Sequence, residues 1–213
     1  MQGSRSSVWF VTAVATALLA GAARPASAEP KYVGVQDCAR CHKKELIGDQ
    51  YGVWKKSDHA KAMESLKTEK AQKIAKERGL TVPPDQADDC VKCHSTAHGL
   101  TSAQLFKKPL QISDGVQCES CHGPGSDYRK KTVMSDEKKA VAAGLRLPSK
   151  DEKTCTQCHN KDSPTWDPAK GFDFEAAKKK IAHAIPKDVK GHYIELEKKA
   201  RKPGAPEEKE EEE

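Results

Sequence analysis

Apolar side chains are scarce in this sequence of 213 residues, of which 32% are charged and only 5% aromatic. From residue 29 onward, Leu, Ile, Val and Phe together supply 27 of 185 positions. Highly charged chains in which these four residue types fall below about 20% tend to remain unfolded. The sequence therefore excludes an ordinary apolar core. Either the chain is largely unfolded, or something other than side chains fills its centre.

Long apolar stretches are also missing, with one exception at the beginning of the chain. Residues 8–23 are mostly apolar, follow Arg5, and precede Ala26, Ser27 and Ala28, which are typical of a signal-peptidase site. The run is shorter than the roughly 20 residues that span a bilayer, which disfavours the alternative of an uncleaved anchor. We expect residues 1–28 to be a cleaved signal peptide of a periplasmic protein without a transmembrane segment.

Cysteine, by contrast, occurs eight times, always in the pattern Cys-x-x-Cys-His, with no cysteine left over. An even number of cysteines in an exported protein first suggests disulfides, but disulfides do not explain the histidines. A zinc site would need two such pairs, or one pair with two further ligands, and leaves the histidines equally unexplained. The four motifs are Cys38-Ala-Arg-Cys41-His42, Cys90-Val-Lys-Cys93-His94, Cys118-Glu-Ser-Cys121-His122 and Cys155-Thr-Gln-Cys158-His159.

The spacing of this motif suits covalent attachment of haem. Residues three and four apart share one face of a helical turn, so the two thiols and the imidazole project from the same side. The thiols can form thioethers with one haem while the histidine binds its iron, and this pattern marks c-type haem attachment. We expect four haem c groups, attached at Cys38, Cys41, Cys90, Cys93, Cys118, Cys121, Cys155 and Cys158 and bound through His42, His94, His122 and His159.

Four haems also account for the missing core. A haem is larger than a Trp side chain, which buries about 150–250 Å², and each buried haem contributes at least roughly 4–6 kcal/mol at 25 cal/mol per Å². We expect a mainly α fold with little β structure, in which short helices and loops of residues 29–200 wrap around four closely packed haems. Without haem, the polypeptide should be mostly disordered.

Local patterns predict a few helices. Helix-forming residues follow His59 and end at Gly79, and short helices are expected around residues 136–143 and 174–184. Weak alternation over residues 110–117 allows at most a short hairpin. The acidic, low-complexity residues 201–213 predict a disordered tail, with a docking element for a basic partner as the alternative.

The basic excess of the chain does not indicate a nucleic-acid partner. The formal net charge of +6 falls to +4 when Arg5 and Arg24 leave with residues 1–28. Haem propionates would add roughly two negative charges per haem, so the basic side chains of the body largely compensate charge within the protein.

Four histidines lie outside the motifs, namely His59, His98, His183 and His192. Their number equals the number of expected irons, so they are candidates for the second axial ligands. For each of them an ordinary surface histidine is the alternative interpretation.

Two sequence elements resemble the tetrahaem cytochrome c-554 family. They are the Trp-x-x-Ser-x-His element formed by Trp54, Ser57 and His59 and the Cys-x-x-Cys-His-Gly-Pro-Gly element that runs from Cys118 to Gly125. The motif order matches over most of the mature chain. The resemblance implies a mainly helical fold with closely stacked haem pairs. It also implies electron transfer from a redox enzyme, in that family hydroxylamine oxidoreductase, to the respiratory chain.

The resemblance also implies axial ligands. By position, His59 corresponds to the distal ligand of the third haem and His183 to that of the fourth. The family expects a histidine after the third motif as distal ligand of the first haem, but residues 123–158 contain no histidine. Met134 and His98 are equal candidates for that role, followed by His192, and simple packing is the alternative for Met134.

The second haem of the family is five-coordinate and can bind small ligands such as nitric oxide. His98 cannot easily cap the haem of His94, because residues four apart lie on one face while the empty position lies opposite.

Three functions are compatible with these features. The first is an electron carrier, not an enzyme, that relays electrons between redox protein partners and has no catalytic residues. The second is an enzyme that reduces nitric oxide or a related nitrogen compound at an open haem, for which the sequence shows no distal pocket with suitable donors. The third is an electron-transfer subunit of a larger multihaem complex. The carrier is the preferred interpretation, and the sequence leaves the oligomeric state open.

Overall fold

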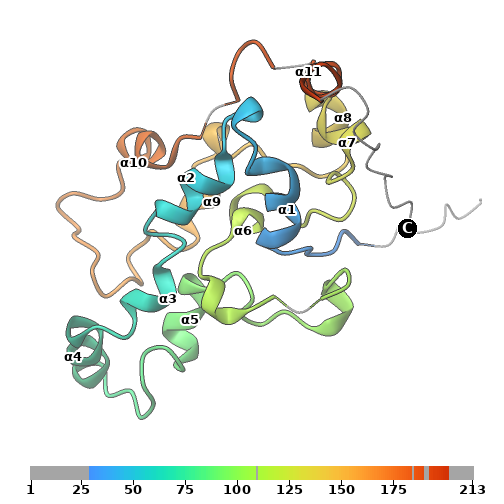
Figure 1. Cartoon of the computed structure of the whole chain (residues 1–213). Coiled ribbons are helices and arrows are strands. Elements are labelled where there is room, and N and C mark those ends of the chain that lie inside the picture. The colour runs from blue at the N-terminus through green and yellow to red at the C-terminus, as the bar shows by residue number, and fades with distance from the viewer. Residues whose placement is uncertain (1–28, 109, 184, 190–191, 202–213) are drawn as a thin grey trace, which may run out of the picture.

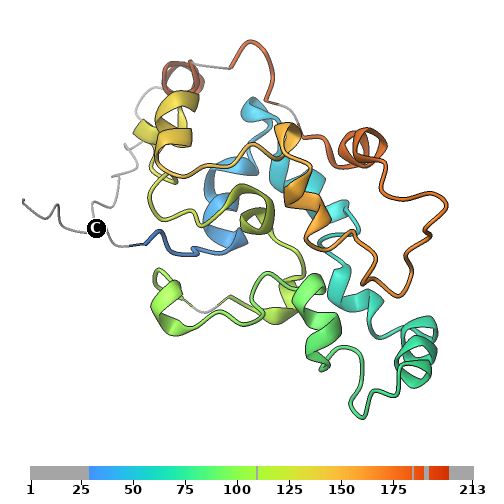
Figure 2. The same cartoon turned by 180° about the vertical axis from the view of Figure 1, so that it is seen from behind.

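The structure, a computed structural model, describes residues 29–108, 110–183, 185–189 and 192–201. The expected signal peptide and nearly all of the expected acidic tail lie outside these residues. Figures 1 and 2 show short helices joined by long irregular connections. The α-helices of the described part are α1 Val35–His42, α2 Gln50–Lys56, α3 Ala62–Ser65, α4 Glu69–Glu77, α5 Asp88–His94, α6 Cys118–His122, α7 Lys131–Met134, α8 Glu137–Ala142, α9 Lys153–Thr156, α10 Phe174–Ile181 and α11 Tyr193–Ala200.

The expectation of a mainly α protein is confirmed. Within the described residues β structure is limited to one isolated parallel bridge, which joins Tyr32 to Leu105. Four short 3-10 helices, Glu45–Ile47, Ser102–Gln104, Ile112–Asp114 and Pro148–Lys150, supplement the α-helices. None of the described helices is long and apolar enough to cross a membrane.

Two expected helices form where side chains cap their first turns. Asp136 accepts hydrogen bonds from the backbone N–H groups of Lys138 and Lys139 at the start of α8. Asp173 accepts one from Ala176 at the start of α10. Such caps satisfy N–H groups that have no partner within the helix, which explains why local sequence located both helices well.

The expected helix after His59 is divided into two. The Ser65 hydroxyl bonds the Ala62 carbonyl at 2.6 Å, and the Thr68 hydroxyl accepts from the Ala71 N–H at 3.3 Å. These side-chain bonds compete with a continuous helix and begin a new one at α4. The predicted end is correct, because Gly79 has a φ of 70° and the Leu80 N–H bonds the Ala75 carbonyl.

The short hairpin that the sequence at most allowed over residues 110–117 does not form. This segment contains the 3-10 helix Ile112–Asp114, and its backbone bonds to other segments in place of bonding across a hairpin. The Thr96 N–H donates to the Gly115 carbonyl, and the Val116 N–H donates to the His59 carbonyl at 3.0 Å. Long-range partners have overridden a weak local alternation.

The side-chain core is as small as the composition predicts. In the described part of the chain, a cluster of buried apolar side chains consists of Met63, Leu66 and Val91, with Cys90 packed against it. Much of the remaining interior is held by hydrogen bonds between loops, so the fold positions its motifs with little apolar burial of its own.

Candidate haem sites

Each Cys-x-x-Cys-His motif lies on or directly after a helical turn. The first three occupy α1, α5 and α6, and the fourth begins in α9 and continues into a turn in which the His159 N–H bonds the Cys155 carbonyl. All eight cysteines lie within the described residues and are half-buried, and none is joined to another in a disulfide. Helical backbone therefore brings the two thiols and the imidazole of each motif to one side, as the spacing predicts.

The imidazoles are oriented by hydrogen bonds at Nδ1. His42 Nδ1 faces Gln50 Oε1 at 3.1 Å, His94 Nδ1 faces the Ala62 carbonyl at 2.8 Å, and His122 Nδ1 faces the Arg146 carbonyl at 3.1 Å. These acceptors require that the Nδ1 atom carries the proton, which leaves Nε2 as the metal-binding nitrogen. Three of the four motif histidines thus have the second interactions that iron ligands need.

Burial keeps these imidazoles neutral. Burial lowers the pKa of His42, and the nearby His183 lowers it further. Burial likewise lowers the pKa of His122 and of His159, the latter with a contribution from His94. A neutral imidazole is the form that binds a metal, so the environment favours the ligand state.

The thiols are held mostly in the protonated form. Burial raises the pKa of Cys121 to about 11 and that of Cys158 to about 12, and neighbouring cysteines add to both shifts. Burial also raises the pKa of Cys90 and of Cys155. Zinc binds thiolates, whereas thioether attachment leaves the sulfur uncharged. Burial thus favours the uncharged form of these four sulfur atoms, whereas the hydrogen bond with Cys38 lowers the pKa of Cys118.

The motifs lie close together in a definite order. The Cys38 and Cys118 thiols are within hydrogen-bonding reach of each other, and α1 packs against α6. Helix α6 also packs against α9, and the Cys121 and Cys155 thiols interact. The Cys158 thiol in turn neighbours that of Cys93. The sites therefore follow one another in space as first, third, fourth and second.

Two histidines outside the motifs face motif histidines. The rings of His59 and His159 have centroids 6.0 Å apart, and those of His122 and His183 lie 5.9 Å apart. His59 thus faces the histidine of the fourth motif and His183 that of the third, whereas the family resemblance implied the third haem for His59 and the fourth for His183.

These separations suit an iron between the rings. Two metal–imidazole bonds of about 2.0–2.1 Å, as in zinc sites, leave room for ring centroids about 6 Å apart. Phe172 stacks on the other side of His159, with centroids 5.1 Å apart. The two ring separations therefore fit ligation of an iron by two histidines at the third and fourth sites.

The segment that carries His59 is held in place by the Trp-x-x-Ser-x-His element. Trp54 Nε1 donates to the Val116 carbonyl at 2.8 Å, and the His59 carbonyl accepts from the Val116 N–H at 3.0 Å. The Ser57 hydroxyl donates to the Trp54 carbonyl at 2.7 Å. Both backbone groups of Val116 are thus used to dock His59 beside α6, two residues before Cys118.

The other distal candidates are placed differently. His98 Nε2 lies 3.1 Å from Asp88 Oδ1 at the start of α5, next to the second motif. The exposed His192 faces Glu195. Met134 is half-buried at the end of α7. Arg129, shortly before it, pairs with Asp37 of α1 at 3.0 Å, which brings this segment toward the first motif.

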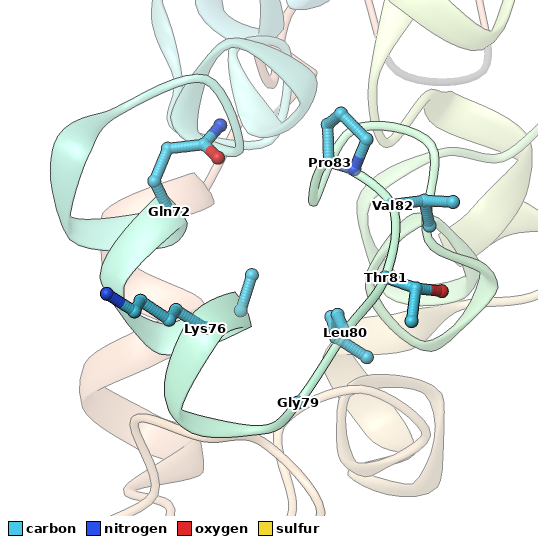
Figure 3. Close-up of a pocket in the computed structure, with 8 residues that line it drawn as sticks. Gln72, Lys76, Gly79, Leu80, Thr81, Val82 and Pro83 are labelled. Carbon is cyan, nitrogen blue, oxygen red and sulfur yellow. The ribbon is translucent and has the colours of Figure 1, made fainter.

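A pocket near the second motif does not contribute ligands. It lies between α4 and the loop that follows (Figure 3), and neither cysteine nor histidine lines it. Across the described ranges, no group of three or more His, Cys, Asp and Glu side chains is arranged to hold a metal ion directly.

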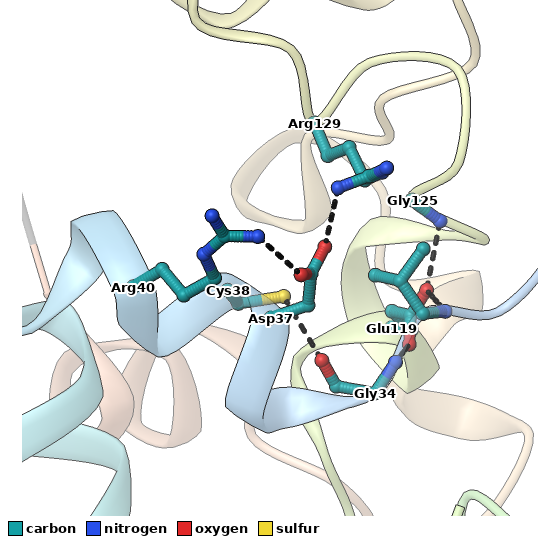
Figure 4. A network of polar contacts seen from close by, with 8 residues as sticks. Gly34, Asp37, Cys38, Arg40, Glu119, Gly125 and Arg129 are labelled. Atoms are coloured by element: carbon teal, nitrogen blue, oxygen red, sulfur yellow. Dashed lines mark hydrogen bonds and ion pairs between the residues drawn. The ribbon is translucent and has the colours of Figure 1, made fainter. Parts of the chain in front are cut away.

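Sequence reasoning missed two buried residues of the third motif. Glu119 and Gln117 are each 1% exposed, and Glu119 accepts three backbone hydrogen bonds, from Val33, Gly34 and Gly125 (Figure 4). Burial raises the pKa of Glu119, and these hydrogen bonds oppose the shift. Nothing in their residue types signals burial, so the sequence offered no means of finding them.

The sequence of this chain is similar to those of known cytochromes. The sequence model of the family "Cytochrome c554 and c-prime" matches residues 37–123. The curated protein cytochrome c-554 of Nitrosomonas europaea is 34% identical over 161 residues, which are 68% of this chain and 64% of that protein. The chain therefore spans somewhat less than two thirds of this relative. The solved structure of reduced cytochrome c554 from the same organism is 28% identical, with a TM-score of 0.48, and the match covers 81% of this chain and 84% of that one. With four sites whose residues fit covalently bound c-type haem, this chain is a multihaem c-type cytochrome related to cytochrome c-554.

Proposed function

We propose that the protein is a periplasmic electron carrier that relays electrons through four covalently bound haems between a redox enzyme and the respiratory chain. The observation that carries this proposal is the spatial order of the motifs, in which the first, third, fourth and second sites adjoin one another. Haem supplies one-electron chemistry at each site. The polypeptide determines how far apart the four sites lie, because the motifs that carry the thiols and imidazoles adjoin one another.

The axial ligands of three sites complete the proposal. His59 binds at the fourth site and His183 at the third, as their ring separations from His159 and His122 support. Met134 would bind at the first site, a role supported by the ion pair of Arg129 with Asp37, which draws the segment before Met134 toward α1. Methionine ligation raises the potential of a haem relative to bis-histidine ligation, so the first site would be the preferred electron acceptor.

A second candidate function is reduction of nitric oxide or a related nitrogen compound at the second site. Helix α3 contacts the Nδ1 edge of His94 through Ala62 and Ser65, so α3 covers the side of the imidazole that faces away from the iron. Among the described rings, none faces His94 as His59 faces His159. This arrangement is compatible with an open iron, although it places no donor for a bound ligand.

Electron titration and electron paramagnetic resonance spectroscopy of the purified holoprotein test both functions. A carrier takes up four electrons per chain and passes them to an oxidised soluble c-type cytochrome. Failure to exchange electrons with any redox protein would overturn the carrier. A high-spin signal that shifts with nitric oxide, together with its catalytic consumption, would favour the enzyme.

The proposed location rests on residues 1–28 and on the relationship to cytochrome c-554. Export would bring the polypeptide into the compartment of the expected electron donor and acceptor. We propose redox proteins as its partners and no nucleic acid. N-terminal sequencing of the protein from a periplasmic extract, with residue 29 as the expected first residue, tests export and cleavage together.

A further inference from the structure

Helix α1, which carries the first motif, lacks a cap from its own sequence. Its N-cap residue is Gly34, with a φ of 84°, and no side chain of the adjoining residues caps it. The backbone N–H groups of Val33, Gly34 and Val35 therefore need partners from elsewhere, since the first N–H groups of a helix have none within it.

These partners come from the third motif. Glu119 Oε1 accepts from Val33 at 2.9 Å, and Glu119 Oε2 accepts from Gly34 at 2.8 Å. Gln117 Oε1 accepts from Val35 at 2.8 Å. Two side chains that flank Cys118 thus cap the helix of Cys38, and the negative charge of Glu119 lies at the positive end of that helix.

Glu119 also binds the segment that follows its own motif. Its Oε1 atom also accepts from the Gly125 N–H at 2.8 Å. A Cβ atom at Gly125 would lie 3.0 Å from Val33 Cγ2 and 3.2 Å from Glu119 Oε1. A side chain at this end of the His-Gly-Pro-Gly element would therefore make Val33 or Glu119 shift by a few tenths of an ångström.

A buried carboxylate is a costly way to join two loops, because its charge leaves water. Nearby Asp37 adds a second negative charge, which Arg129 and Arg40 balance at 3.0 and 3.5 Å (Figure 4). Hydrogen bonds to a carboxylate are short and directional, so this arrangement fixes geometry more sharply than apolar packing would.

We propose that Glu119, assisted by Gln117, is a positioning residue that sets the distance and relative orientation of the first and third haem sites. The inference rests on the proposed electron relay, because that function gives the geometry of this pair its importance. The carboxylate accepts its hydrogen bonds from the backbone N–H groups of Val33, Gly34 and Gly125. It acts through the backbone from which Cys38 and His42 project.

The test compares Glu119→Gln with Glu45→Gln in the holoprotein. Glutamine keeps one acceptor oxygen but places an NH₂ group against backbone N–H donors. Glu45 is exposed near the first motif, so its variant removes the same charge without breaking these bonds. The readouts are the intact mass, the haem–haem coupling in electron paramagnetic resonance, and the Soret circular dichroism couplet. We expect Glu119→Gln to retain four haems and lose the coupling of one haem pair, whereas Glu45→Gln matches the wild type.

Gln117→Met provides a milder variant in case Glu119→Gln does not accumulate. It removes only the acceptor of Val35, and we expect a smaller change of the same coupling. Wild-type coupling in both variants, with or without a lower melting temperature, would overturn the proposal, since a merely structural role moves stability alone. A wild type that fails to exchange electrons would instead defeat the proposed function, and the coupling would still be measurable.

Discussion

Replacing Gly115 with alanine tests whether the segment before α6 holds His59 at the fourth site. Gly115 has a φ of 70°, and a Cβ there would lie 2.6 Å from the His59 carbonyl oxygen and 2.9 Å from that of Ala60. Ordinary van der Waals contact begins at 3.4 Å. One backbone segment must therefore move by about 0.8 Å, and shifts near 1 Å are enough to misplace a functional group.

The energetic cost can be worked out from the same contacts. Gly115 combines its positive φ with a ψ of −147°, a conformation nearly restricted to glycine that costs a residue with a Cβ about 1–3 kcal/mol. Displacing His59 also weakens the 3.0 Å hydrogen bond from the Val116 N–H, a loss of about 1 kcal/mol. Gly79 has the same φ, and no atom lies within 4 Å of its would-be Cβ. Gly79→Ala therefore places a Cβ at a positive φ without a steric clash and is the control.

Chemical denaturation and electron paramagnetic resonance of the two holoproteins measure the difference. Gly115→Ala should be less stable than Gly79→Ala by about 1 kcal/mol and should convert one low-spin haem to high spin as His59 leaves its iron. Equal stability and identical spectra of the two variants would refute the docking of His59 through Val116.

Three further experiments examine the ligands and the loop around the third motif. In a chain without the fourth haem, made by Cys155→Ser and Cys158→Ser, His59→Ala should leave the remaining spectrum unchanged; a new high-spin haem would place His59 on another iron. Met134→Leu should lower the highest reduction potential in a redox titration, because methionine ligation raises the potential of a haem. An unchanged potential would show that Met134 only packs against its neighbours and binds no iron. Tyr128→Phe removes the hydroxyl that donates to the Gly123 carbonyl at 2.5 Å and should destabilise the holoprotein by about 1–2 kcal/mol, as measured by denaturation; unaltered stability would contradict this.

Features set by local spacing could be predicted from the sequence. The thiols and imidazole of each motif share one side because the positions i, i+3 and i+4 do so in any helical turn. Helices α8 and α10 follow from Asp136 and Asp173, whose carboxylates cap them within three residues. In each case the interacting groups are close in the chain, so the sequence pattern is enough to predict how they are arranged in space.

Features set by distant contacts could not be predicted. His59 meets His159 and His183 meets His122 because loops cross the sites, and no local pattern in the sequence indicates these ring contacts. The caps of α1 come from residues more than eighty positions away. A glutamate in a charged sequence is ordinarily a surface residue, and only the fold shows that Glu119 is buried.

Intact mass spectrometry of the exported protein, combined with its absorption spectrum, tests the central claim most directly. Covalent haem at every Cys-x-x-Cys-His motif predicts a mass that exceeds the polypeptide from residue 29 by four haem groups, together with the absorption bands of c-type cytochromes. A colourless protein whose mass equals that of the polypeptide alone would contradict the account.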